Sequence, residues 1–482
     1  MTTAITIGMI IIYVAIMMGI GVYTARQTRS VSDFVLGSHS VGSWLTAFAY
    51  GTSYFSAVVF IGYAGQFGWT YGVSAAWVGV GNALLGSLLA WIVLGRRTRI
   101  MTQSLGAKTM PEYFEKRWNS KGLKIAAALI VFVFLIPYTA SVYNGLSRLF
   151  NMAFQIESEG AYKIIIIVMA LLTAIYVILG GYAATAINDF IQGIVMLIGI
   201  AAVVICAIQN QGGLTSALAA LGEIEVNGKT NTLNSVFGPD PLNLLGVVIL
   251  TSLGTWGLPQ MIHKFYAIKS ENDIKKGAVI STVFALIVAG GSYLLGGFDR
   301  LFCTLTEDGS GKTVISTLSN GKPDFDAMIP SLLHTALPDI LIGLVVVLVL
   351  SASMSTLSSL VLTSSSTLTI DLIKPNLKKC SDKKEMLIMR VLIAVFLVIS
   401  VLLAFNKNAS ISTLMSYSWG ALAGAFLGPF MYGLFSRKIT KPAVWTSFIL
   451  GIGLTLVHMF LFGFGWNPEL SKAAASLPLN LA

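Results

Sequence analysis

Serine and threonine side chains are concentrated in one apolar stretch in the second half of the sequence. Between Ser351 and Thr369, twelve of nineteen residues are Ser or Thr, inside an uncharged 31-residue stretch, Ile340–Ile370. Hydroxyl groups are costly in hydrocarbon unless they meet another helix, water or an ion. The cluster therefore favours either close packing between helices or the coordination of a small hard cation by oxygen atoms.

The composition is typical of a protein that crosses a membrane many times. Of the 482 residues, 55% are hydrophobic and 11% are charged, and the mean hydropathy is +0.79, whereas about 25% of the residues of soluble domains are charged. No segment is long and polar enough to form a separate soluble domain. Apolar runs of about 20 residues predict twelve spans, near residues 4–24, 41–68, 72–95, 125–147, 163–182, 188–208, 243–266, 277–297, 340–370, 387–405, 409–436 and 442–463.

The net charge of +10 reflects orientation in the membrane rather than binding to nucleic acid. Most of the 31 Lys and Arg fall on one side if the N-terminus lies outside, and the densest cluster runs from Arg96 to Lys124. The positive-inside rule predicts that this side is cytoplasmic, where the basic residues contact anionic lipid. We therefore expect a multi-pass protein of the cell membrane.

Two predicted spans contain residues that interrupt a helix. The second has Gly51 among small polar residues, and the seventh has Gly254, Gly257 and Pro259. Glycine and proline weaken the helical ladder, and freed carbonyl groups are tolerated in a membrane only where they line a cavity or are buried in protein. Because these spans are five apart, they predict two inverted repeats of five helices with a binding site at the midplane.

These patterns predict an all-α polytopic membrane protein with one transporter domain over residues 1–482. Residues 1–40 would form a leading helix and loop, 41–208 the first repeat, 209–436 the second repeat, and 437–482 a trailing helix and tail. An enzyme is not expected, because the spans offer almost no carboxylates, histidines or nucleophile–base pairs. Lys264 is expected to lie at the cytoplasmic end of span seven and to snorkel toward the interface.

Three motifs in these spans resemble the sodium:solute symporter family, most closely its proline and pantothenate branch. The first is Asp33–Gly37, the second runs from Tyr176 through a double glycine to Gly193, and the third is Met354–Ser358. The similarity extends from Ile5 to the last span. It implies a secondary active symporter that imports a small organic solute with Na⁺ by alternating access.

The resemblance also implies the residues of an ion site and an ion pathway. The ligands of Na⁺, the coupling ion, would be the carbonyl oxygens of Thr52, Phe55 and Ala352 and the hydroxyls of Ser355 and Thr356. Neutral oxygens suit this hard cation, and a broken helix releases carbonyls three residues apart. Asp189 resembles the acidic residue of the family near the cytoplasmic exit, although an aspartate there could also cap a helix.

The solute is expected beside the interrupted parts of spans two and seven. Half-helix N-termini there could hold a carboxylate without a full positive charge. Aromatic residues of the proline-specific members are replaced here by Thr251 and Thr255, whereas the run Ala186–Leu197 and the turn Gly257–Pro259 look closer to pantothenate carriers. The resemblance therefore implies a small carboxylate, with pantothenate slightly ahead of an amino acid such as proline. The candidate contacts are Ser53, Ser56, Tyr138, Thr255, Trp256 and Gln260.

Two departures from the family and two alternative functions follow from the same residues. Tyr54 stands where many proline-type members have an aspartate, and the chain stops after twelve spans where the family more often has thirteen. The C-terminus is then expected outside.

A proton-coupled symporter is the nearest alternative, although it needs a titratable group at the midplane, and none is expected in spans two, seven and nine. An ion channel is the second alternative, but no selectivity-filter motif occurs.

Overall fold

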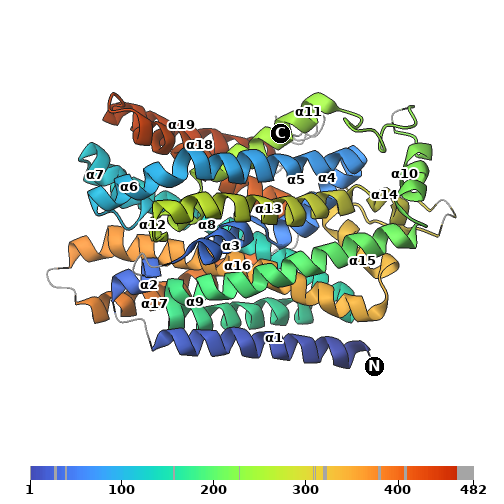
Figure 1. Cartoon of the computed structure of the whole chain (residues 1–482), viewed down its shortest axis with the longest axis horizontal. Coiled ribbons are helices and arrows are strands. Elements are labelled where there is room, and N and C mark those ends of the chain that lie inside the picture. Colours follow the sequence, from blue (N-terminus) through green and yellow to red (C-terminus); the bar gives the residue numbers. More distant parts are fainter. Residues whose placement is uncertain are drawn as a thin grey trace.

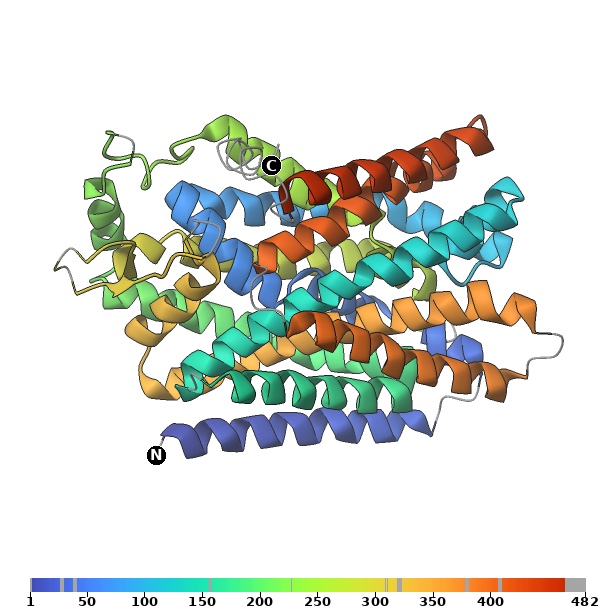
Figure 2. The same cartoon turned by 180° about the vertical axis from the view of Figure 1, so that it is seen from behind.

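The computed structural model is a bundle of long helices, most of which run along the long axis of the molecule (Figure 1). The structure describes residues 2–26, 30–37, 41–155, 158–226, 228–307, 309, 311–318, 323–377, 381–405 and 410–463. The predicted tail after residue 463, with the C-terminus and its side of the membrane, lies outside the described residues. The chain begins at the end of the bundle that carries α10, α14 and α15, opposite the end that carries α6 and α7 (Figures 1 and 2).

The α-helices are, in order, α1 (Thr2–Ala25), α2 (Val31–Leu36), α3 (Ser43–Tyr54), α4 (Ala64–Tyr71), α5 (Ala76–Gly81), α6 (Arg96–Leu105), α7 (Met110–Trp118), α8 (Lys121–Phe154), α9 (Glu159–Asn210), α10 (Leu214–Glu223), α11 (Pro241–Leu253), α12 (Pro259–Ala267), α13 (Glu271–Gly296), α14 (Asp299–Phe302), α15 (Met328–Ala336), α16 (Asp339–Thr367), α17 (Asp382–Ala404), α18 (Ile411–Phe435) and α19 (Lys441–His458). Short π-helical or 3-10 segments extend several of them, among them Val58–Tyr63, Asn82–Leu88, Gly254–Gly257 and Leu368–Ile373. The strands β1 (Cys303–Thr304) and β2 (Thr313–Val314) pair in parallel.

Eight described helical stretches are long and apolar enough to cross a membrane, or nine if the bent pair Pro241–Gly257 and Pro259–Ala267 counts as one span. Two of the eight are longer than one crossing needs. Val58–Leu105 has 48 residues and Glu159–Asn210 has 52, whereas about 20 are enough. The chain is therefore a multi-pass membrane protein. Twelve spans and the five-plus-five repeat stay predictions.

The predicted fifth and sixth spans are joined in one helix, α9, which is interrupted at Gly181. This residue has φ 56° and ψ −147°, a conformation that glycine adopts far more readily than other residues. A Cβ atom at this position would lie 2.7 Å from the carbonyl oxygen of Phe34, in α2. The double-glycine motif therefore lets α9 change direction where α2 packs against it.

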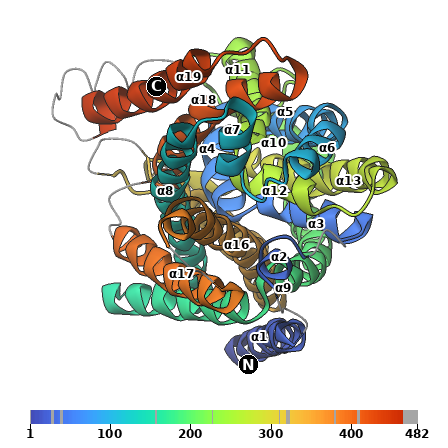
Figure 3. The same ribbon diagram turned by 90° about the vertical axis from the view of Figure 1, so that its left-hand side faces the viewer.

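The hydroxyl-rich helix α16 lies near the centre of the bundle when the molecule is seen end-on (Figure 3). It packs against α1, α3, α8, α9, α12 and α17. In its most apolar window 78% of the residues are buried, compared with 11% in α19. Its hydroxyl groups therefore meet protein rather than lipid, as polar groups in a membrane require.

Candidate functional site

The helix α3 stops inside the bundle. It ends at Tyr54, and Phe55 has extended backbone with φ −99° and ψ 121°, before the chain resumes as a π-helical segment at Val58. The last carbonyl groups of a helix have no partner four residues further on. The carbonyl oxygens of Thr52 and Phe55, both buried, are therefore available to side chains of other helices.

Two hydroxyls of α16 contact these freed carbonyls. Ser355 Oγ lies 3.2 Å from the carbonyl oxygen of Thr52, and Thr356 Oγ1 lies 3.4 Å from the same oxygen and 3.5 Å from that of Phe55. The two hydroxyls also lie 3.0 and 3.2 Å from the carbonyl oxygen of Ala352, one turn earlier. We call these five atoms the oxygen cluster.

The spacing within the oxygen cluster suits a small hard cation. Oxygens bind Ca²⁺, an ion of similar size to Na⁺, at about 2.4 Å, so two ligands at right angles are separated by about 3.4 Å. The separations of 3.0 to 3.5 Å between hydroxyl and carbonyl oxygens lie near this value. A hydroxyl can either donate to a carbonyl or present its lone pairs to a cation. Within the described residues, no group of three or more His, Cys, Asp or Glu could hold a metal ion.

A second interruption lies between α11 and α12. The 3-10 turn Gly254–Gly257 and the extended residue Leu258 separate the two helices, which are bent by 54°. Pro259 begins α12, a position where proline is favoured because its missing N–H would have no partner. A Cβ atom on Gly257 would lie 2.8 Å from Cα of Ala423, so α18 approaches the backbone closely here.

All six candidate solute contacts are buried, but polar atoms already have nearby partners in four of them, Ser53, Ser56, Thr255 and Trp256. Ser56 Oγ accepts from the N–H of Val58 over 3.2 Å, which caps the segment after the break. Thr255 Oγ1 donates to its own helix at Ser252, and Trp256 Nε1 donates to the carbonyl of Leu85. Each of these bonds therefore stabilises the backbone at one of the two helix interruptions.

Gln260 is better placed to meet a solute. Both polar atoms of the Gln260 amide are buried without a hydrogen bond to any described residue. The Tyr138 ring lies 6.2 Å from the ring of Trp419, which lies 6.4 Å from Tyr54. Trp419, on α18, was not predicted from the sequence, because no motif marks it and its place depends on how α18 packs. Ser53 Oγ lies 2.8 Å from Ser359 Oγ on α16.

Lys264 does not snorkel to the interface as predicted. Its side chain is 2% exposed, and its Nζ lies 3.0 Å from Ser359 Oγ and 3.6 Å from Asp189 Oδ2. The prediction was wrong because α12 is a short half-helix that packs against α3, α6 and α16, which keeps its end inside the protein. Span seven therefore ends in a buried ionisable side chain. The Asp189 side chain is also fully buried.

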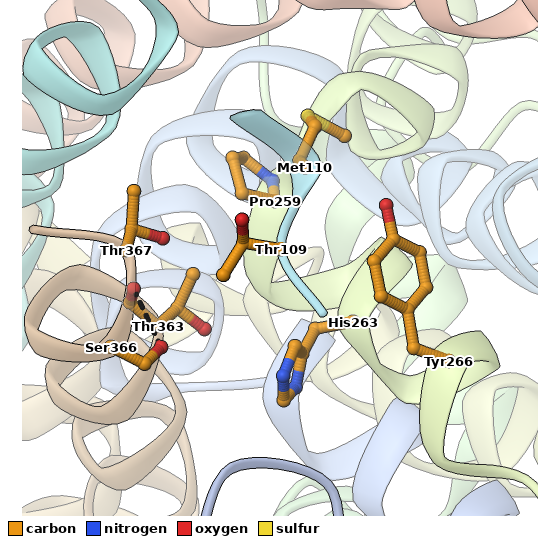
Figure 4. Close-up of a pocket in the computed structure, with 8 residues that line it drawn as sticks. All are labelled: Thr109, Met110, Pro259, His263, Tyr266, Thr363, Ser366 and Thr367. Carbon is orange, nitrogen blue, oxygen red and sulfur yellow. Dashed lines mark hydrogen bonds between the residues drawn. The ribbon is translucent and has the colours of Figure 1, made fainter. Parts of the chain in front are cut away.

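Two cavities lie on either side of this region. Toward α7, a cavity of about 10 Å³, room for about one water, is bordered by α16, α12 and the start of α7 (Figure 4). Its lining residues are Thr109, Met110, Pro259, His263, Tyr266, Thr363, Ser366 and Thr367. Toward α15, a wider cavity of about 920 Å³ is lined by residues that include Arg148, Gln155 and His334.

Comparison with known proteins identifies the family. The model of the sodium:solute symporter family matches residues 34–451. The sodium/proline symporter of Staphylococcus aureus (strain JH9) is 30% identical over 459 residues, which cover 93% of this chain and 85% of that protein, and the match to the symporter of strain COL has the same values.

Two solved structures share the fold. A Na⁺-coupled sialic acid symporter in a substrate-bound outward-open state superposes with a TM-score of 0.69 at 18% identity, covering 98% of this chain and 92% of that one. A nucleobase-cation-symport-1 family transporter in a closed conformation gives 0.51 at 14% identity, covering 93% and 90%. The fold, the interrupted helices and the family match lead to one conclusion: this chain belongs to the sodium:solute symporter family.

Proposed function

We propose that this protein imports a small organic carboxylate together with Na⁺ by alternating access, with proline the first solute to test. The observation that carries the proposal is the contact between the α16 hydroxyls and the freed carbonyls of α3. The relatives named sodium/proline symporters favour proline. The comparisons give no such support to pantothenate, which the sequence had placed slightly ahead.

Sodium would act as a removable bridge between α3 and α16. With Thr52, Phe55, Ala352, Ser355 and Thr356 as ligands, the ion would hold the broken helix in one position. Solute bound beside that helix would then be held more tightly. The coupling must be reciprocal, because the factor by which Na⁺ raises solute affinity equals the factor by which solute raises Na⁺ affinity.

The solute would lie between the two interruptions. The first turn of α12 carries the positive end of the helix dipole, which favours an anion such as a carboxylate, although Met261 and Ile262 already donate their N–H groups to the Leu258 carbonyl. Gln260 lies in that turn and has free amide atoms, and Ser53, Ser56, Tyr138, Thr255 and Trp256 would complete the surroundings. Asp189 would receive the ion on its way out, so Asp189→Asn should slow turnover.

The decisive experiment is binding of a solute panel to the purified protein with and without Na⁺ at constant ionic strength. The panel contains proline, pantothenate, pyruvate and acetate, and K⁺ replaces Na⁺ in the control. We expect one carboxylate to bind, and to bind more tightly with Na⁺. A protein that responds to neither sodium nor any carboxylate would contradict the proposal.

Proton coupling is the second candidate, because the buried pair of Lys264 and Asp189 places titratable groups inside the bundle. It predicts uptake into proteoliposomes driven by a pH gradient when choline replaces all Na⁺. Sodium coupling predicts no such uptake.

A further inference from the structure

The hydroxyls of α16 continue beyond the oxygen cluster as a ladder. Ser355, Ser359, Thr363 and Thr367 follow one another at intervals of four residues, so they lie on one face of the helix, each about 6 Å from the next. Ser355 belongs to the oxygen cluster, whereas Thr363 and Thr367 line the small cavity toward α7 (Figure 4). The hydroxyl ladder therefore extends along α16 from the oxygen cluster to that cavity.

The amino group of Lys264, on α12, lies beside the hydroxyl ladder between its two ends. The Nζ of Lys264 donates to Ser359 Oγ over 3.0 Å, one turn from the oxygen cluster and one turn from the cavity. Ser359 Oγ lies 2.8 Å from Oγ of Ser53, the residue after Thr52 on α3. A cation moving along the ladder would meet the ammonium group, which repels it.

The ammonium group of Lys264 compensates the buried negative charge of Asp189. Its side chain is fully buried, and neither oxygen accepts a hydrogen bond from a described residue. Its ion pair is with Lys264, at 3.6 Å, which is longer than a hydrogen bond. A buried carboxylate needs a nearby cation, and a pair this loose leaves room for a second cation to compete.

We propose that Lys264 is a tethered cation that competes with sodium for Asp189 and keeps the inner end of the ion path closed. This inference rests on the proposed sodium coupling. Sodium that leaves the oxygen cluster along the hydroxyl ladder reaches the cavity only when the ammonium group moves away from Ser359. Lys264 is a positioning residue in this scheme, because it acts through Asp189 and is not itself a ligand of the ion.

The test is sodium binding to the purified full-length protein, followed by tryptophan fluorescence during Na⁺ titration at constant ionic strength. Lys264→Gln should tighten apparent Na⁺ binding at least about threefold, because Asp189 then lacks its competing partner. Asp189→Asn should weaken it, because Lys264 still repels the ion. A purely structural ion pair would not shift affinity in opposite directions for its two halves. Lys275→Gln removes an exposed lysine from α13 and should change nothing.

A double variant keeps the test valid if Lys264→Gln fails to fold around an unpaired carboxylate. Lys264→Gln in the Asp189→Asn background leaves two neutral side chains, and it should bind Na⁺ more tightly than Asp189→Asn alone. Equal affinity of these two variants, or unchanged affinity of a folded Lys264→Gln variant, would overturn the role of Lys264. A wild-type protein without any sodium response would instead overturn the proposed function.

Discussion

Ser355 Oγ on α16 donates to the carbonyl oxygen of Thr52 on α3 over 3.2 Å, joining residues that are 303 positions apart. Serine hydroxyls in membrane helices usually bond to carbonyls of their own helix. Ser365 does so here, with Val361 and Leu362. Ser355 contacts the Ala352 carbonyl of its own helix over 3.0 Å and also reaches the end of an interrupted helix.

Removal of either hydroxyl from the oxygen cluster should weaken the response to sodium. We expect Ser355→Ala and Thr356→Ala to lower apparent Na⁺ affinity at least several-fold, because each deletes one of five oxygens. Sodium-dependent uptake or sodium-dependent thermal stabilisation would measure the change. Ser365→Ala, which deletes a buried hydroxyl outside the oxygen cluster, serves as the matched control. If all three variants kept the sodium dependence of the wild type, the ion would bind elsewhere.

Gln260 and Trp256 should separate solute binding from support of the broken helix. Gln260→Leu should raise the KM for the solute about tenfold with little change in stability, because its amide atoms have no partner in the described protein. Trp256→Phe should mainly lower thermal stability, because it removes the bond to the Leu85 carbonyl. Uptake kinetics and melting curves of both variants would check this, and a reversed pattern would exchange the two roles.

The resemblance to the family implied Ser355 and Thr52 as neighbours, but nothing in the sequence indicated the position of Lys264. Gly51 and the run of hydroxyls are local features. Gly51 indicates an interrupted helix, and the hydroxyls indicate a polar helix surface inside the membrane. The depth of Lys264 depends on where the chain bends at Leu258 and on which helices surround α12. Such tertiary placement leaves no local pattern, and the same reason explains why Trp419 was missed.

The close approach of α13 to α4 should make one glycine of α13 far less replaceable than another. A Cβ atom on Gly296 would lie 2.0 Å from the carbonyl oxygen of Ala64, whereas a Cβ on Gly290 would meet nothing within 4 Å. Backbone atoms cannot yield as a side chain can, and small residues allow such packing in membranes. Gly296→Ala should therefore sharply reduce the folded fraction, while Gly290→Ala is tolerated. Size-exclusion profiles and melting temperatures would measure the difference between the two variants. Equal folded fractions and melting temperatures would contradict the close approach of α13 to α4.

The buried carboxylate of Asp326 should make stability depend on pH. Asp326 lies in the connection between α14 and α15, and its Oδ2 accepts from the N–H of Ile411 at the start of α18 over 3.0 Å. Burial raises the pKa of Asp326 to about 6, against the opposing effect of Arg148 and the Ile411 N–H. In the unfolded chain its pKa is about 3.9. The folded state therefore binds more protons between these values.

It follows that the contribution of Asp326 to stability is present below about pH 4 and is lost as the pH rises through about 6. The loss is on the order of 2–3 kcal/mol, since one pKa unit corresponds to about 1.4 kcal/mol. Asp326→Asn keeps an acceptor for Ile411 without the charge, so it should flatten this part of the pH profile and melt above the wild type at pH 7. Melting curves between pH 4 and 7.5 would test this against Glu307→Gln, a change in an exposed loop. A profile of Asp326→Asn parallel to that of the wild type would show that another group controls the pH dependence.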